Sequence, residues 1–241
     1  MKGLIVAYGE RDSRGKDRLS EPRGLLKFGG KEVIRHTLDR FEEIGCVDET
    51  SLIIHPKNRE QYEKSLGNDK RVRIAEYSGP SDPVFVYINA FKKIGPDSDI
   101  LAVADDNLFD FSLSGLVECF NYAGTNVLAV RNIEFMPGCS GSDFGRCTFS
   151  DEGKVIEASY SFGPPKDIDS KWATLDIYLM HKKTISSLLE DVRNPSAYPQ
   201  QMIDKYATDF HAWIKNDGFW ADVGKPGMRR EAERYFSAKH P

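Results

Sequence analysis

Runs of strand character alternate with segments of helical periodicity along the first 130 residues, and this alternation constrains the fold more than any other feature. The strand-like runs occupy residues 2–7, 51–55, 71–77, 99–104 and 126–130. The helical segments occupy residues 31–44, 58–66, 84–94 and 113–122, and Gly45 stands where a C-terminal cap is expected. Strands that alternate with helices form a mostly parallel, doubly wound sheet, so we predict an α/β, Rossmann-like fold.

The second half of the chain has more β character. Its predicted β segments are residues 144–149, 154–162, 173–180, 211–215 and 218–221, and its predicted helices are residues 184–192, 198–205 and 226–238. No repeat, low-complexity segment or linker separates the two halves. We therefore predict a single domain over residues 1–241, in which residues 131–241 supply a smaller β-rich lobe that covers the substrate.

The composition is that of an ordinary globular chain, with 40% hydrophobic residues, 29% charged residues and a net charge of −4. Without a long basic run, nucleic acid is not expected as a partner. No apolar stretch approaches the roughly 20 residues that cross a bilayer, and no signal-peptide core is evident, so we expect a cytoplasmic protein without a membrane partner. The sequence also lacks C-x-x-C, H-E-x-x-H and G-x-S-x-G patterns, which disfavours zinc and serine-esterase chemistry.

A charged segment follows the first strand, where doubly wound sheets bind their ligands. It holds six cations among four acids, and the cations are Arg11, Arg14, Lys16, Arg18, Arg23 and Lys27. Backbone N–H groups and basic side chains at such a place can bind phosphates. The segment has neither the P-loop pattern nor the dinucleotide-binding pattern. Taken alone, the pattern is weak and is more typical of a solvated charged loop.

Acidic residues follow two other strand-like segments. Asp105 and Asp106 come directly after the strand at residues 99–104, and Asp222 follows the one at residues 218–221. One or two carboxylates together with phosphate oxygens and water are the usual ligands of Mg²⁺. The alternative is that these residues are ordinary turn caps. Sequence spacing leaves open whether Asp106 and Asp222 lie near each other.

Five short segments, in order, resemble the sugar-1-phosphate nucleotidyltransferase family over nearly the whole chain. They are Met1–Gly9 (for M-K-G-I-I-L-A-G-G), Pro22–Lys31 (for P-K-P-L-L-P-x-x-x-K), Val103–Phe109 (for L-x-G-D-N-x-F), Phe144–Val155 (for Y-G-V-V-x-x-D-x-x-G-K-V) and Trp220–Pro226 (for W-x-D-x-G-T-P). The resemblance implies the nucleotide-diphospho-sugar transferase fold, with residues 1–130 as the nucleotide-binding half. It also implies an Mg²⁺-dependent reaction between a nucleoside triphosphate and a sugar 1-phosphate, or another phosphorylated small molecule, that releases pyrophosphate.

The resemblance also implies roles for individual residues. The implied roles are metal binding for Asp106 and Asp222, catalysis for Arg23 and Arg14, nucleotide binding for Ala7, Tyr8, Gly9 and Arg11, and substrate binding for Gly145 and Asp176. Association into a homo-oligomer is also compatible with the resemblance.

Several positions depart from the family pattern. The second glycine of G-x-G is Arg11, and the lysine of P-K is Arg23, which keeps the charge but replaces a point charge with a planar fork. The Glu and Lys that hold the sugar phosphate are replaced within Ser159–Phe162, and the glycine before I-Y is Asp176. An alternative function is therefore a catalytically impaired relative that binds a nucleotide or nucleotide sugar as a regulatory or partner subunit.

Overall fold

A computed structural model describes the chain at residues 1–7, 21–67, 69–79, 83–136, 138, 144–158, 168–191, 206 and 209–239. The helix predicted at residues 198–205 and the end of the β segment predicted at residues 154–162 lie outside these residues. Within them, no helix is both long enough and apolar enough to cross a membrane.

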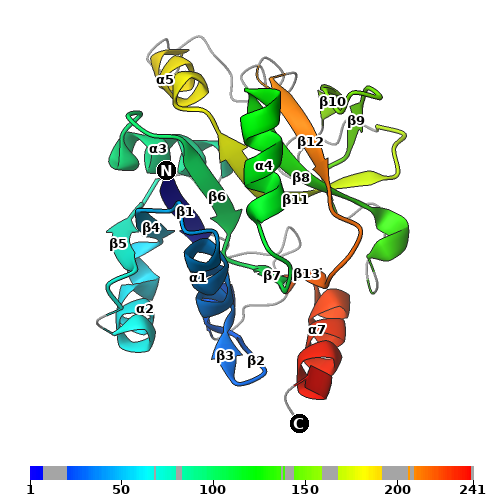
Figure 1. The fold of residues 1–241 in the computed structure, drawn as a ribbon. Coiled ribbons are helices and arrows are strands. Elements are labelled where there is room, and N and C mark those ends of the chain that lie inside the picture. The colour runs from blue at the N-terminus through cyan, green and yellow to red at the C-terminus, as the bar shows by residue number, and fades with distance from the viewer. Residues whose placement is uncertain are drawn as a thin grey trace.

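A seven-stranded sheet forms the centre of the molecule, with the strand order β12-β8-β11-β6-β1-β4-β5 (Figure 1). The strands are β1 (Lys2–Ala7), β4 (Glu49–Ile54), β5 (Val72–Glu76), β6 (Ile100–Ala104), β8 (Asn126–Asn132), β11 (Trp172–Met180) and β12 (Phe210–Ile214). All run parallel to their neighbours except β11, which is antiparallel to β6 and β8. The predicted α/β fold with a mostly parallel, doubly wound sheet is confirmed.

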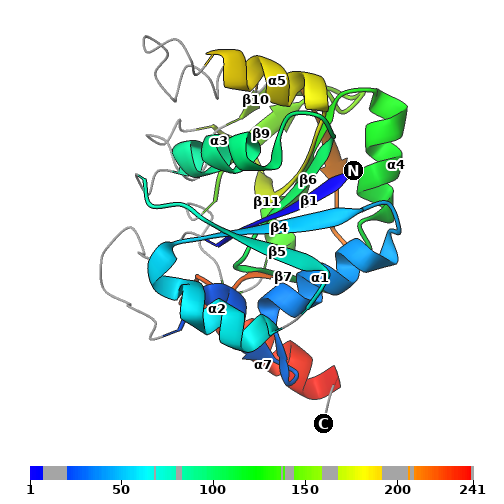
Figure 2. The same cartoon turned by 90° about the vertical axis from the view of Figure 1, so that its left-hand side faces the viewer.

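Helices cover both faces of this sheet because side chains alternate between the faces along each strand. The helices are α1 (Val33–Glu43), α2 (Arg59–Leu66), α3 (Pro83–Ile94), α4 (Ser114–Ala123), α5 (Lys182–Asp191) and α7 (Pro226–Lys239). Ile5 of β1 belongs to the apolar cluster formed with α1, α2, α4 and α7. Its neighbours Leu4 and Val6 belong to the opposite cluster, formed with α3 and α5. Figure 2 shows these helices on the two sides of the sheet.

Helix α1 lies close to β1 because β1 carries a glycine at the point of contact. A Cβ atom at Gly3 would lie 2.8 Å from the ring of Phe41 and 2.7 Å from Oγ1 of Thr50, so a larger residue there would push the helix outward. The helix ends at Glu43, one residue earlier than predicted. Gly45 follows the cap with a φ of 65° and donates a 3.0 Å hydrogen bond to the carbonyl of Glu42.

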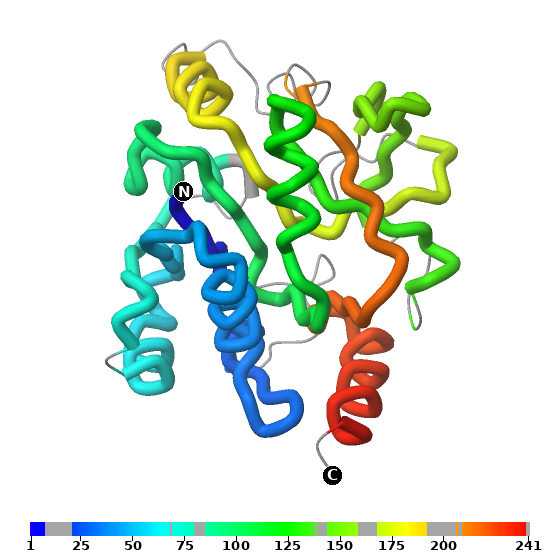
Figure 3. Tube along the Cα trace, viewed as in Figure 1, coloured from blue at the N-terminus to red at the C-terminus, as the bar shows by residue number. Residues whose placement is uncertain are grey.

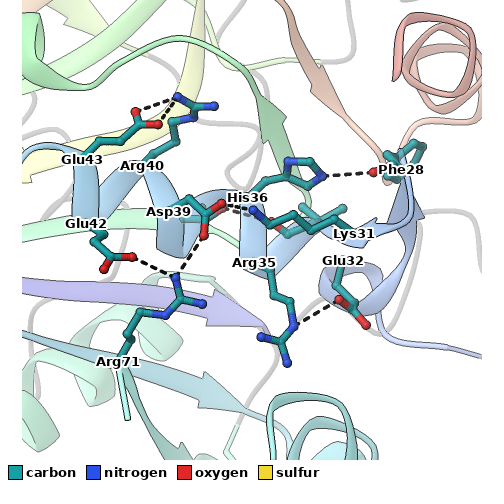
Figure 4. A network of polar contacts seen from close by, with 12 residues as sticks. Phe28, Lys31, Glu32, Arg35, His36, Asp39, Arg40, Glu42, Glu43 and Arg71 are labelled. Atoms are coloured by element: carbon teal, nitrogen blue, oxygen red, sulfur yellow. Dashed lines mark hydrogen bonds and ion pairs between the residues drawn. The ribbon is translucent and has the colours of Figure 1, made fainter. Parts of the chain in front are cut away.

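An ion network ties the outer side of α1 to the segment before β5 (Figure 4). Arg71 contacts Asp39 at 3.0 Å and Glu42 at 3.1 Å, both on α1. Arg71 also contacts Asp69 at 2.8 Å. Hydrogen bonds from Arg71 lower the pKa of Asp69 to about 2. Every charged side chain in this network therefore has a partner of opposite charge, and we assign the network a structural role.

Short strand pairs supplement the central sheet. They are β2 (Lys27–Phe28) with β3 (Lys31–Glu32), β9 (Cys147–Phe149) with β10 (Val155–Ala158), and β7 (Asn107–Phe109) with β13 (Trp220–Asp222). The prediction for residues 144–149 placed the strand start three residues too early, and β7 was not predicted at all. Figure 3 traces the chain from β12 through β13 into the C-terminal helix α7. The β7–β13 pair thus brings the last part of the chain to the end of β6.

Candidate active site

The candidate site lies at the carboxyl end of β6, beside β1. The strand order changes direction here, because the chain places β4 and β5 on one side of β1 and β6, β11 and β8 on the other. Ligands of doubly wound sheets bind at such a switch point. Ala7 ends β1 at this edge, and Asp105 and Asp106 directly follow β6.

Asp106, Asp222 and Arg23 come together at this edge. In the β7–β13 pair, Asp222 lies opposite Asn107, and the N–H of Val223 donates a 2.9 Å hydrogen bond to the carbonyl of Asp106. Nη1 of Arg23 lies 2.8 Å from Oδ2 of Asp106, and the two side chains are 18% and 17% exposed. The site is therefore enclosed but still reachable by a ligand.

Gly224, in the turn that follows β13, leaves room for this cluster because it has no side chain. A Cβ atom at Gly224 would lie 2.6 Å from Nη1 of Arg23 and 2.8 Å from Oδ1 of Asp222. The N–H of Gly224 also donates a 2.8 Å hydrogen bond to Oδ1 of Asp222. The glycine of the W-x-D-x-G motif is thus explained by close packing of Arg23 over the backbone.

The carboxylates repel one another. Burial, and then the negative charge of Asp106, raise the pKa of Asp222 well above its usual range. Burial alone would lower the pKa of Arg23, but the charges of Asp106, Asp222 and Asp105 outweigh burial and raise it. The negative charge at this edge is consequently only partly balanced, which favours the binding of cations.

Asp105 holds the backbone of Gly24, the residue that follows Arg23. Its Oδ2 accepts a 2.8 Å hydrogen bond from the hydroxyl of Tyr62 and a 3.0 Å hydrogen bond from the N–H of Gly24. Burial, and then the charge of Asp106, raise its pKa to about 7. Sequence reasoning missed Tyr62, because a tyrosine on the buried side of a helix is an ordinary core residue by its pattern.

Asp176 belongs to β11, and Gly145 is bonded to the same strand. The carbonyl of Gly145 accepts a 3.0 Å hydrogen bond from Thr174, two residues before Asp176. The hydroxyl of Tyr178 donates a 2.7 Å hydrogen bond to Oδ1 of Asp176. Burial first, and then Asp106, raise the pKa of Asp176 to about 6, although Tyr178 and Lys225 act against this rise. Asp176 therefore experiences the charge of the same site as Asp106.

The donor set fits Mg²⁺ but not a cage built from protein ligands alone. Among the described residues, no three histidine, cysteine or acidic side chains are grouped so that they could hold a metal ion. Asp106 and Asp222 supply two hard oxygen ligands, and their mutual repulsion would be relieved by a divalent cation. Four other residues implied for the site, Tyr8, Gly9, Arg11 and Arg14, lie outside the described residues, as does Ser159–Phe162.

Residues 19–236 match the family model described as Nucleotidyl transferase, so the chain belongs to the nucleotidyl transferase family. It is 24% identical over 245 residues to the bifunctional protein GlmU of Methanocaldococcus jannaschii, which covers 99% of this chain and 55% of that protein. It is 21% identical to the mannose-1-phosphate guanylyltransferase catalytic subunit beta of Dictyostelium discoideum, over 94% of this chain and 62% of that protein. The chain thus spans little more than half the length of these curated relatives.

Solved structures of nucleotidyltransferases share the fold. One is a UDP-glucose pyrophosphorylase complexed with UDP-glucose, with a TM-score of 0.74, 16% identity and coverage of 99% of this chain and 98% of that one. Another is the inositol-1-phosphate CTP transferase of T. maritima, with a TM-score of 0.73, 14% identity and coverage of 98% and 94%. A Bacillus anthracis protein described as a glucose-1-phosphate thymidylyltransferase has a TM-score of 0.75, 18% identity and coverage of 97% and 94%. These findings confirm the predicted family and fold.

Proposed function

We propose that this chain joins a nucleoside triphosphate to a sugar 1-phosphate, or to a related phosphorylated small molecule, and releases pyrophosphate. The observation that carries the proposal is the meeting of Asp106, Asp222 and Arg23 at the switch point of the sheet. Two carboxylates and a guanidinium in one enclosed place can bind a metal and a phosphate together.

In the proposed reaction, a phosphate oxygen of the acceptor attacks the α-phosphorus of the triphosphate. A new P–O bond forms, the bond between the α-phosphorus and the bridging α–β oxygen breaks, and pyrophosphate leaves with the electron pair. The attacking oxygen is already ionised at neutral pH, so the reaction does not require a general base. Positioning and charge neutralisation supply the rate enhancement instead.

Arg23 is the described residue best suited to hold the phosphates. The hydrogen bond from the N–H of Gly24 to Asp105 fixes the backbone next to Arg23, and the hydrogen bond to Asp106 fixes its guanidinium. A planar guanidinium can bind two phosphate oxygens at once. Lys225 supplies a second positive charge, with its ammonium 5.7 Å from the centre of the Phe144 ring.

We assign Asp106 and Asp222 as the ligands of Mg²⁺. When bound, the ion would neutralise charge on the phosphate oxygens of the nucleotide. Asp106 directly precedes β7 and Asp222 ends β13, so the β7–β13 pairing sets the spacing between the two carboxylates.

The test is turnover by the full chain in the presence of Mg²⁺. Each of the common nucleoside triphosphates would be incubated with a panel of sugar 1-phosphates, and pyrophosphate release would be measured with and without EDTA. We expect release with at least one pair and its loss in EDTA. Absence of release from every pair, with protein shown to be folded by circular dichroism, would overturn the proposal. Nucleotide binding measured by calorimetry in the same samples would then favour the impaired relative.

A further inference from the structure

Asp176 has an unusual backbone conformation for a residue in a strand. Among the residues that the structure describes, it is the only non-glycine residue with a positive φ, which is 52°. The pairing of β11 with β8 is interrupted between Thr174 and Tyr178, so Asp176 lies in the irregular part of the strand. Aspartate tolerates this conformation better than most residues but still at some cost in free energy. Strain of this kind is retained mainly where a side chain has to be aimed.

Asp176 lies beside the candidate active site. Strand β11 runs antiparallel to β6, and Ile177 lies opposite Val103, two residues before Asp105. The electrostatic influence of Asp106 and Lys225 on Asp176 agrees with this placement. The side chain is partly exposed rather than sealed in the core. It is therefore available to a bound molecule.

Among the described residues, no lysine or arginine lies within ion-pair distance of Asp176, and Lys225 acts on it only at longer range. Asp176 also does not complete a three-ligand metal set with Asp106 and Asp222. A partly buried carboxylate with one hydrogen bond and no cation is costly unless a ligand supplies the missing partner.

Two tyrosines border the same carboxylate. Tyr178 donates its hydroxyl to Asp176, and its ring meets the ring of Tyr87 edge to face, with centroids 6.2 Å apart. Through this ring contact Tyr87 lies on the same side of β11, and burial, and then the charge of Asp176, raise the pKa of Tyr87 well above its usual range. A carboxylate beside aromatic rings is a favourable setting for an organic cation.

We propose that Asp176, flanked by Tyr178 and Tyr87, selects an acceptor that carries a positively charged amine or quaternary ammonium group. This inference rests on the proposed function, because it concerns the non-phosphate end of the acceptor. A phosphate facing Asp176 would be repelled, and a sugar hydroxyl would gain one hydrogen bond but leave the negative charge unbalanced. An ammonium group would balance the charge, and its source is either an amino sugar phosphate or a phosphorylated amino alcohol.

The experiment compares acceptors that differ in charge but hardly in shape. Glucosamine 1-phosphate is paired with glucose 1-phosphate, and choline phosphate is paired with its neutral isostere 3,3-dimethylbutyl phosphate. We expect at least a tenfold preference in kcat/KM for the charged member of one pair, which also identifies the source of the ammonium group. In Asp176→Asn the preference is expected to fall to within about threefold, because asparagine keeps the shape and tolerates the positive φ.

The controls separate charge recognition from folding. Asp97→Asn removes an exposed carboxylate that pairs with Lys2 at the opposite end of β1, and it should leave the preference unchanged. Tyr178→Phe should lower the preference without reversing it. Calorimetric binding of the four acceptors with nucleotide present gives the same comparison without turnover. Equal rates or affinities for charged and neutral members would overturn this inference alone, whereas absence of turnover with all acceptors would overturn the proposed function.

Discussion

Asp105 and Asp176 stand at two positions where the resembled family pattern has glycine, yet the molecule treats the two carboxylates differently. Asp105, at the end of β6, is buried and accepts hydrogen bonds from Tyr62 and from the N–H of Gly24. Asp176, in the middle of β11, is partly exposed, has one hydrogen bond and sits in a strained backbone conformation. The protein itself supplies hydrogen-bond donors to the carboxylate of Asp105, whereas the negative charge of Asp176 is left for a bound molecule to balance.

The difference teaches how one site can use the same side chain for two purposes. A carboxylate whose hydrogen bonds all run inward adds order to the frame, here to the turn that carries Arg23. A carboxylate that faces the ligand and lacks a cation costs stability and can gain it back only on binding. Asp222 belongs with the second kind, because burial and the charge of Asp106 both act against its ionised form. Asp106 stands between the two kinds, because Arg23 already pairs with it.

The largest expected effect comes from removing a proposed metal ligand. We predict that Asp106→Asn and Asp222→Asn each lower kcat by about 10³-fold or more, close to 4 kcal/mol of transition-state stabilisation. The loss should be equal for charged and neutral acceptors, in contrast to Asp176→Asn. Steady-state pyrophosphate release at saturating Mg²⁺ measures it. Near-normal rates in both variants would remove the metal assignment.

The second prediction concerns Asp105, the carboxylate that is buried in the fold. We predict that Tyr62→Phe lowers the free energy of unfolding by about 2 kcal/mol, because it leaves buried Asp105 without one of its donors. Tyr178→Phe removes the equivalent donor from partly exposed Asp176 and should cost less than 1 kcal/mol, since water can replace the hydroxyl. Urea denaturation of both variants gives the comparison. Equal losses would mean that the two carboxylates are equally structural.

Much of the fold could be predicted from the sequence because it rests on local patterns. Apolar runs of strand length and helical stripes are set by neighbouring residues, and the sheet order then follows from the α/β rules. Boundaries were less predictable: the pair β7–β13 joins residues 107–109 to residues 220–222 by only three residues on each side. Strands this short carry almost no periodicity.

The site could be predicted only in part, and for a similar reason. A motif at the end of a strand marks Asp106 and Asp222 as candidates, but their meeting depends on a contact between distant segments. The partnership of Tyr62 with Asp105 is tertiary, and nothing in the helix around Tyr62 signals it. For Asp176, the departure from glycine was visible, but the positive φ and the missing cation are properties of the folded chain alone.

The smallest effect tests whether Asp176 costs stability, as a ligand-facing carboxylate should. Its pKa is raised to about 6, so the folded state holds a proton that the unfolded state has lost between about pH 4 and pH 6. Stability from this group is therefore present below pH 4 and lost as the pH rises through 6. We predict that Asp176→Asn is more stable than the native chain by about 1 kcal/mol at pH 7, a value reduced from the full shift because the side chain is partly exposed.

Asp69 provides the matched comparison, since its pKa is shifted in the opposite direction, to about 2. A lowered pKa stabilises the fold above about pH 4 and loses that contribution only as the pH falls toward 2, so Asp69→Asn should cost about 1 kcal/mol at both pH 7 and pH 4. The gain from Asp176→Asn should instead disappear by pH 4. Urea denaturation of the two variants at pH 7 and pH 4 measures whether each substitution raises or lowers the free energy of unfolding. If Asp176→Asn were destabilising at pH 7, the carboxylate of Asp176 would stabilise the fold as that of Asp105 does. The contrast between these two positions, at which the family pattern has glycine, would then be lost.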